Sequence, residues 1–379
     1  MDKAIELTKQ LIEIPSASGD EANILAFLED FLALNSAQTV RTKDFVAGLF
    51  ENSNSDMLNS TKKAVVLTGH IDTVSAGELS RWYSSPWSAV ETEAEITGLG
   101  ASDMKAGMAA SLVAGIDFWQ AQGKTADFDL WLVAAANEEI DGSGSAAFAE
   151  WLKNSGRNYD QIYGFIGEPT GGEQIEVGHR GNRFVNIEFA GISGHASQQA
   201  NFAKSALAKA SNFIAKTDKI VADLHAGYTN SILGAPSMVP TSLQAGDQTS
   251  PNKTAPNATL TLDIRTTPEL DADFDNWLNS LAAQFDFTWH YHSEVAPSCL
   301  ISQDSHVVKT LLEAANLSQK AITVSPGATD QAFWVSGLGA EIVVFGPGDF
   351  SQAHRQNETI AKAKIGEFYQ VCVNFLKQI

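Results

Sequence analysis

The chain has 379 residues, of which 44% are hydrophobic, and a formal net charge of −20. This length exceeds the usual size of one hydrophobic core, so two domains are expected. The absence of any long apolar run excludes a membrane-spanning helix, and the acidic charge disfavours nucleic acid as a partner. The N-terminus lacks the pattern of a secretory signal and no Cys-x-x-Cys occurs, so we expect a cytoplasmic protein.

The predicted elements of the first 180 residues alternate between helices and strands. An amphipathic helix is expected at the N-terminus, with Ala4, Leu7, Leu11 and Ile14 on one face. Short apolar runs predict buried strands at 64–67, 130–134 and 163–166, and helical spacing is found at 108–120 and 145–153. This alternation is typical of an α/β fold in which helices flank a mostly parallel central sheet.

After Gly178 the pattern changes. Residues 183–190 and 259–265 alternate apolar and polar positions, as strands with one wet face do, and 205–220 has helical spacing. These features predict a smaller α+β domain over 180–290. The remaining chain returns to the first pattern, with a helix near 307–315, a buried strand at 342–345 and a closing helix at 361–377. The large domain is therefore expected to comprise 1–179 and 291–379, with the smaller domain inserted.

The stretch VVLTGHIDTV places His70 and Asp72 at the end of a predicted buried strand. Side chains two positions apart in a strand point to the same side, so the carboxylate can orient the imidazole. A buried polar group is costly unless it is paired or holds a metal. Taken alone, the stretch leaves two interpretations open: a structural His–Asp pair or part of a functional site.

Other predicted strands also deliver polar side chains to their carboxyl ends, where ligands gather in open α/β sheets. These residues are Glu138 and Glu139 after 130–134, Glu168 after 163–166, and His354 in GPGDFSQAH after 342–345; Asp103 lies in the turn GLGASDMKAG. Two histidines and three carboxylates without thiolates suit two divalent metal ions, with zinc expected and cobalt or manganese as alternatives. The remaining carboxylate of the Glu138–Glu139 pair is then available as a general base.

Taken in order, TGHIDTV, GASDMKAG, NEE, GEPT and GPGDFSQAH resemble the motifs of the di-zinc aminoacylases and carboxypeptidases, which include acetylornithine deacetylase and succinyl-diaminopimelate desuccinylase. The resemblance spans essentially the whole chain and implies a catalytic large domain. The roles that it implies there are a bridging Asp103, further metal ligands His70, Glu168, Glu139 and His354, a general base Glu138, and Asp72 as the residue that orients His70.

For the inserted domain, the resemblance implies a dimerisation (lid) role and a homodimer. The motif SGHAS places His195 where the family has a histidine that reaches a partner subunit's active site. Arg265 and Asn252 match positions that bind the substrate carboxylate or stabilise the oxyanion, although Pro256 comes one residue later than the family pattern has it. Arg180 in GHRG is a further candidate anion binder. A surface-loop histidine and a solvated arginine remain alternatives for His195 and Arg265.

The resemblance implies hydrolysis of the amide bond of an N-acylated amino acid. VGHRG and FGPGDFSQAH are closer to acetylornithine deacetylases, whereas Ala328-Thr329-Asp330 is closer to desuccinylases. We expect N-acetylornithine as the substrate, in arginine biosynthesis; a desuccinylase of lysine biosynthesis or a related metallo-carboxypeptidase is the alternative. A nucleotide-binding protein and a serine hydrolase are disfavoured, because neither a complete glycine-rich phosphate motif nor a G-x-S-x-G elbow occurs.

Overall fold

The computed structural model describes residues 1–52, 62–122, 125–293, 295–325 and 327–379. The chain divides into two compact units. The large unit consists of Met1–Gly178, Leu300–Ser325 and Thr329–Ile379; the small unit consists of His179–Cys299 and a short segment ending at Ala328. The sequence places 291–299 in the large domain. In the structure, 291–293 and 295–299 belong to the small unit, where Ala296 exchanges backbone hydrogen bonds with Asn182.

The large unit is built on one sheet with the strand order β1-β2-β6-β3-β7-β15-β8-β13, and β14 pairs with β8. Its strands are β1 (Gln38–Arg41), β2 (Phe45–Phe50), β3 (Lys63–His70), β6 (Phe128–Ala135), β7 (Gln161–Ile166), β8 (Ile175–His179), β13 (Cys299–Leu300), β14 (Ile322–Ser325) and β15 (Glu341–Val344). A separate small sheet contains β4 (Val90–Glu91), β5 (Glu95–Thr97) and β16 (Thr359–Ala361). The helices are α1 (Asp2–Glu13), α2 (Ala22–Leu34), α3 (Ala106–Gln122), α4 (Ser143–Asn154), α9 (His306–Ala314), α10 (Gln331–Leu338) and α11 (Lys362–Gln378).

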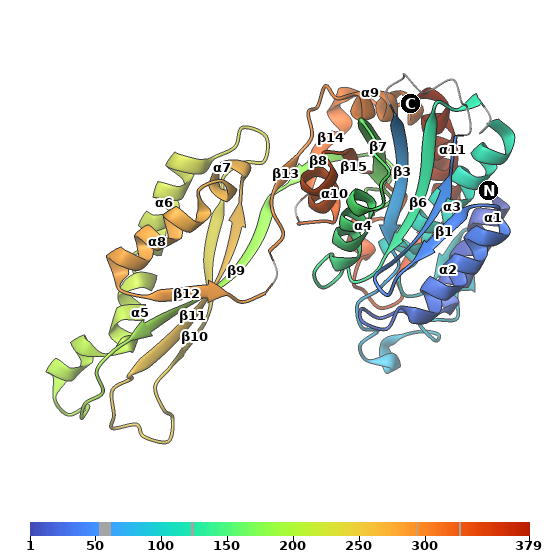
Figure 1. Cartoon of the computed structure of the whole chain (residues 1–379). Coiled ribbons are helices and arrows are strands. Elements are labelled where there is room, and N and C mark those ends of the chain that lie inside the picture. The colour runs from blue at the N-terminus through green and yellow to red at the C-terminus, as the bar shows by residue number, and fades with distance from the viewer. Residues whose placement is uncertain (53–61, 123–124, 294, 326) are drawn as a thin grey trace. The chain divides into compact units, whose positions relative to one another are not determined.

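The central strands β6, β3, β7 and β15 run parallel, and antiparallel strands β2 and β8 flank them. Helices cover both faces of this sheet (Figure 1). Leu130 and Leu132 of β6 lie against Gly115 of α3, whereas Trp131 points the other way and packs on Phe148 of α4. Coverage on both faces explains why the central strands read as continuous apolar runs. The predicted α/β class with a mostly parallel sheet is confirmed.

The N-terminal helix α1 ends one residue earlier than the sequence pattern predicts. Ala4, Leu7 and Leu11 of α1 are buried as expected, and Ile12 is buried with them. Ile14 lies outside the helix, because the following proline disfavours helical dihedrals at the residue before it. Its backbone is extended, with φ −95° and ψ 110°.

The small unit contains a sheet of antiparallel strands in the order β10-β11-β9-β12, with helices against it (Figure 1). Its elements are β9 (Gly181–Ala190), α5 (Ala206–Ile214), α6 (Thr217–Tyr228), β10 (Ser237–Ala245), β11 (Asn257–Thr266), α7 (Pro268–Asp271), α8 (Phe274–Phe285) and β12 (Thr288–Tyr291). Burial alternates along β11, and Leu260, Leu262 and Ile264 lie in the core. The helix expected over 205–220 is two helices, because Lys216 adopts φ −106° and ψ 0° and leaves the helical conformation.

Candidate active site

Polar side chains converge at the carboxyl ends of the parallel strands of the large unit. His70 is the last residue of β3, and Glu138 and Glu139 follow the end of β6 closely. Glu168 follows β7, and His354 lies in the segment after β15. Because the four strands are parallel, their carboxyl ends lie along one edge of the sheet. The structure thus brings together side chains that are distant in the sequence.

Asp103 lies between the two histidines. Its Oδ1 is 3.2 Å from Nε2 of His70, and its Oδ2 is 3.8 Å from Nε2 of His354. Each histidine also has its own glutamate: Glu168 Oε1 is 3.6 Å from Nε2 of His70, and Glu139 Oε2 is 2.9 Å from Nε2 of His354. We call these pairs the His70 half-site (His70 and Glu168) and the His354 half-site (His354 and Glu139), with Asp103 shared between them.

The donor set fits divalent metal ions. In each of two groups the ligand atoms lie within 4.8 Å of one another; the groups are His70, Glu138 and Glu168, and His70, Asp103 and Glu139. Among the described residues, Oε1 of Glu168 has no hydrogen-bond partner although the residue is only 8% exposed. A cation would satisfy this buried oxygen. Imidazole and carboxylate ligands suit zinc, cobalt or manganese, and both cysteines are buried in other parts of the chain.

The electrostatics of the site also indicate a need for positive charge. Burial raises the pKa of Glu168 to about 8 and that of Asp330 to about 7. Burial, and then the Glu168 carboxylate, raise the pKa of Glu138 well above its usual range. Burial would lower the pKa of His70, but Glu168 and Asp103 outweigh it and raise that pKa well above its usual value. Bound cations would let these carboxylates ionise at neutral pH.

The sequence predicts that Asp72 orients the His70 imidazole. In the structure it also positions the backbone of Glu138 and Glu139. Nδ1 of His70 lies 3.0 Å from the Asp72 carbonyl oxygen and 3.4 Å from its carboxylate. Oδ1 of Asp72 accepts a hydrogen bond from the Glu138 amide at 3.1 Å, and Oδ2 accepts one from the Glu139 amide at 3.2 Å. The Ser18 hydroxyl donates to Oδ2 at 2.7 Å. Asp72 therefore fixes the backbone of both glutamates, and Ser18 fixes Asp72; no motif in the sequence points to Ser18.

The small unit places Arg180 and Arg265 near one end of its sheet. Arg265 pairs across β11 and β9 with Asn182, two residues from Arg180. Nε of Arg265 lies 2.9 Å from Oδ1 of Asp263 on its own strand, and a guanidinium nitrogen of Arg180 donates to the Ala235 carbonyl at 3.0 Å. Both arginines therefore have partners within the unit.

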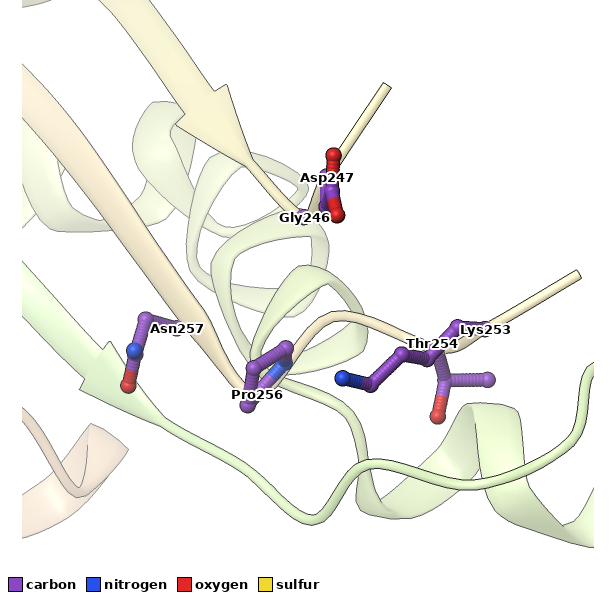
Figure 2. Close-up of a pocket in the computed structure, with 6 residues that line it drawn as sticks. All are labelled: Gly246, Asp247, Lys253, Thr254, Pro256 and Asn257. Atoms are coloured by element: carbon purple, nitrogen blue, oxygen red, sulfur yellow. The ribbon is translucent and has the colours of Figure 1, made fainter. Parts of the chain in front are cut away.

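The loops that carry His195 and Asn252 are joined in the small unit. The Ala196 amide donates to the Asn252 carbonyl at 2.8 Å, and His195 forms a β-bridge with Lys253. Figure 2 shows the pocket beside this junction, which is lined by Gly246, Asp247, Lys253, Thr254, Pro256 and Asn257. Nδ1 of His195 accepts the Ser197 amide hydrogen bond at 3.2 Å. The neutral ring therefore carries its proton on Nε2, and the side chain is exposed.

His195 and Arg265 lie toward opposite ends of the small unit's sheet. The loop joined to His195 leads into β11 at Asn257, and Arg265 is near the other end of that strand. Eight residues of extended chain span about 26 Å, at about 3.3 Å per residue. The structure thus places the four predicted substrate-binding residues as two pairs within the small unit, His195 with Asn252 and Arg180 with Arg265.

The fold and the site together define an α/β protein with a candidate metal centre, and the family model makes the class specific. Peptidase family M20/M25/M40 matches residues 66–378, and the chain belongs to this family. Within the described ranges, no helix has the length and apolar character needed to cross a membrane.

The chain is similar to succinyl-diaminopimelate desuccinylases. It is 33% identical to that of Paracoccus denitrificans over 198 residues, which are 51% of this chain and 50% of that protein. The chain thus spans about half the length of the first curated relatives that it matches. The desuccinylase of Sulfurovum sp. is 26% identical over an alignment of 386 positions, which covers 98% of each chain.

Solved structures share the fold. The M20 family metallo-carboxypeptidase Sso-CP2 from Sulfolobus solfataricus aligns with a TM-score of 0.75 and 19% sequence identity. The alignment covers 100% of this chain and 99% of that chain. At this level of identity the match establishes the architecture alone.

Proposed function

We propose that the protein is a two-metal amidohydrolase that removes the acyl group from an N-acyl amino acid. The observation that carries this proposal is the single carboxylate of Asp103, whose two oxygens face two imidazoles at 3.2 and 3.8 Å. His70, Glu168, Asp103, Glu139 and His354 would hold the two ions. Divalent ions held there would polarise the scissile carbonyl and lower the pKa of the attacking water.

Glu138 is the proposed general base. The Glu138 backbone amide donates a hydrogen bond to Asp72 at 3.1 Å. This bond fixes the backbone at Glu138 without using the Glu138 carboxylate, which stays available for proton transfer. The half-buried carboxylate would take a proton from the attacking water and return it to the leaving amine. Burial raises the pKa of Glu138 well above its usual range. A raised pKa helps the carboxyl group to keep the proton after it is taken from the water and before it is given to the amine.

The small unit is proposed to supply the substrate contacts. The Nε2–H of His195 would donate a hydrogen bond to the oxyanion that develops during attack, from one subunit of a homodimer to the site of its partner. Arg180, Arg265 and Asn252 are the proposed groups for the substrate carboxylate. We also propose that the enzyme acts in the cytoplasm.

Two acyl groups, succinyl and acetyl, are the candidates for the group that is removed. The relatives named above are desuccinylases, and Asp330 fits the same branch. N-succinyl-diaminopimelate is therefore the first compound to test. N-acetylornithine, which the motifs around Arg180 and His354 favour, is the second. A succinyl group carries an additional carboxylate, which needs a cation, whereas an acetyl group needs only a small apolar pocket.

The test compares kcat/KM for N-succinyl-diaminopimelate, N-acetylornithine and an unacylated dipeptide with one zinc-loaded preparation. We expect one of the acylated compounds to exceed the dipeptide at least tenfold, which corresponds to about 1.4 kcal/mol in transition-state binding. Exhaustive chelation should abolish this activity, and added zinc or cobalt should restore it. A preference for the dipeptide would make the enzyme a peptidase, and full activity without metal would contradict the two-metal proposal.

A further inference from the structure

We propose that Glu358 is a positioning residue that sets the metal affinity of the site by holding the backbone of Asp103. The inference rests on the proposed function, because it takes Asp103 as the shared metal ligand. Glu358 lies outside both half-sites and belongs to none of the groups of ligand atoms described above. No motif assigned from the sequence includes it.

The Glu358 carboxylate accepts three backbone hydrogen bonds from the turn that carries Asp103. Oε1 accepts from the Ser102 amide at 2.6 Å and from the Asp103 amide at 2.8 Å. Oε2 accepts from the Gly100 amide at 2.9 Å. The residue is only 1% exposed, so these three donors stabilise the carboxylate in place of water.

This arrangement excludes two simpler roles for Glu358. Both of its oxygens already accept hydrogen bonds from the backbone, so the carboxylate is not placed as a metal ligand. The side chain is buried, so it does not reach a substrate at the surface of the site. What it can do is fix where the Asp103 backbone lies, and therefore where the two Asp103 oxygens point.

Glu358 also links the segment of His354 to the turn of the shared Asp103. It comes four residues after His354, directly before β16, which pairs with β5 just ahead of the Asp103 turn. The Gly98 amide donates to the Glu358 carbonyl at 3.0 Å, and the Asp349 amide donates to the Ser102 hydroxyl at 2.7 Å. These bonds hold the segment of His354 against the turn of Asp103. The separation of Asp103 and His354 thus depends on Glu358.

The experiment measures metal binding to metal-free protein with the Glu358→Gln and Glu358→Ala substitutions. The glutamine side chain has the same shape as glutamate, but its amide nitrogen cannot accept a hydrogen bond. At least one of the three backbone N–H groups therefore loses its partner. We expect Co²⁺ to bind on the order of 10–100-fold more weakly to either variant, by calorimetry, as for other groups that orient metal ligands. The visible absorption of the bound Co²⁺ should change as well.

A matched control is Glu176→Gln, which neutralises a half-buried carboxylate in β8, on a different segment from the Asp103 turn. It should leave the Co²⁺ affinity and spectrum at wild-type values. Circular dichroism establishes that each variant is folded, and Glu358→Gln decides the question if Glu358→Ala does not fold. If wild-type protein binds Co²⁺ and Glu358→Gln binds it equally well with the same spectrum, the positioning role is wrong. If wild-type protein binds no Co²⁺, the proposed function itself fails.

Discussion

At the residue scale, Glu138 and Glu139 are neighbours with different expected roles. Both amides are held by Asp72, but Oε2 of Glu139 lies 2.9 Å from His354, whereas Glu138 has no such partner among the two half-sites. We expect Glu138→Gln to lower kcat by ~10²–10⁴-fold, because a positioned acid–base group is lost. Metal content, measured by elemental analysis, should stay at the wild-type level.

Glu139→Gln is the contrasting substitution. It removes a carboxylate from the His354 half-site, so metal content should fall together with activity. Equal metal loss in both variants would contradict the separate roles, and wild-type turnover in Glu138→Gln would remove the assignment of the general base.

The sequence could predict this cluster because each residue lies at the end of a recognisable strand, in the segment that follows one, or in a recognisable turn. Parallel strands bring their carboxyl ends together whatever the lengths of the connections between them. Ser18 and Glu358 could not be predicted in the same way. They act through backbone amides and through Asp72, and such contacts leave no residue pattern at a fixed spacing.

At the scale of elements, β8 carries a titratable group whose effect on stability can be measured. Burial raises the pKa of Glu176 from 4.5 to about 7. Below pH 4.5 the side chain is protonated in both the folded and unfolded states. As the pH rises to about 7 the unfolded chain releases the proton first, so the free energy of unfolding falls.

Glu176→Gln should remove this pH dependence. Relative to wild type, the variant should become more stable between pH 5 and 8 by roughly 1–3 kcal/mol, allowing for the partial exposure of the side chain. Urea denaturation of metal-free protein at a series of pH values measures the difference. A stability difference that does not change with pH would show that Glu176 does not titrate as the fold requires.

The limits of element prediction in this chain have local causes. The apolar pattern predicted β3, β6, β7 and β15 of the large sheet and β9 and β11 of the small unit's sheet, because each of these strands buries a defined face. It gave no prediction for the other strands or for helices such as α2, α8 and α10. It did not reveal that Ala215 and Lys216 separate α5 from α6, since the side-chain spacing continues across these two residues. It also extended the first helix to Ile14, where the dihedral restriction imposed by Pro15 should have ended it.

At the scale of the whole molecule, the small unit has an exposed sheet edge. β10 is the first strand in the order β10-β11-β9-β12, and Val239 and Leu243 on it are 53% and 38% exposed. An exposed edge strand offers unpaired backbone groups to another chain. This feature supports the proposed homodimer, in which a second copy would cover the edge. The sequence alternation predicts β9 and β11 but not β10, so it does not reveal this edge.

The proposed dimer makes a prediction about how two damaged copies would behave. His195 is exposed, and the Nε2–H of its neutral ring can donate a hydrogen bond to an oxyanion. Losing such a donor costs roughly 3–4 kcal/mol in comparable sites, so His195→Ala should be nearly inactive, and Glu138→Ala should be inactive for the reason given above. If His195 serves the partner's site, mixing the two proteins should create heterodimers with one intact site. Activity should then recover to at most about a quarter of the wild-type value, since half of randomly mixed dimers are heterodimers and each has one of its two sites complete.

The His195→Ala protein mixed with itself provides the control. Subunit exchange, followed with differently labelled copies, must be complete before activity is read. Complete exchange without recovery would mean that His195 acts within its own chain or has no part in the reaction.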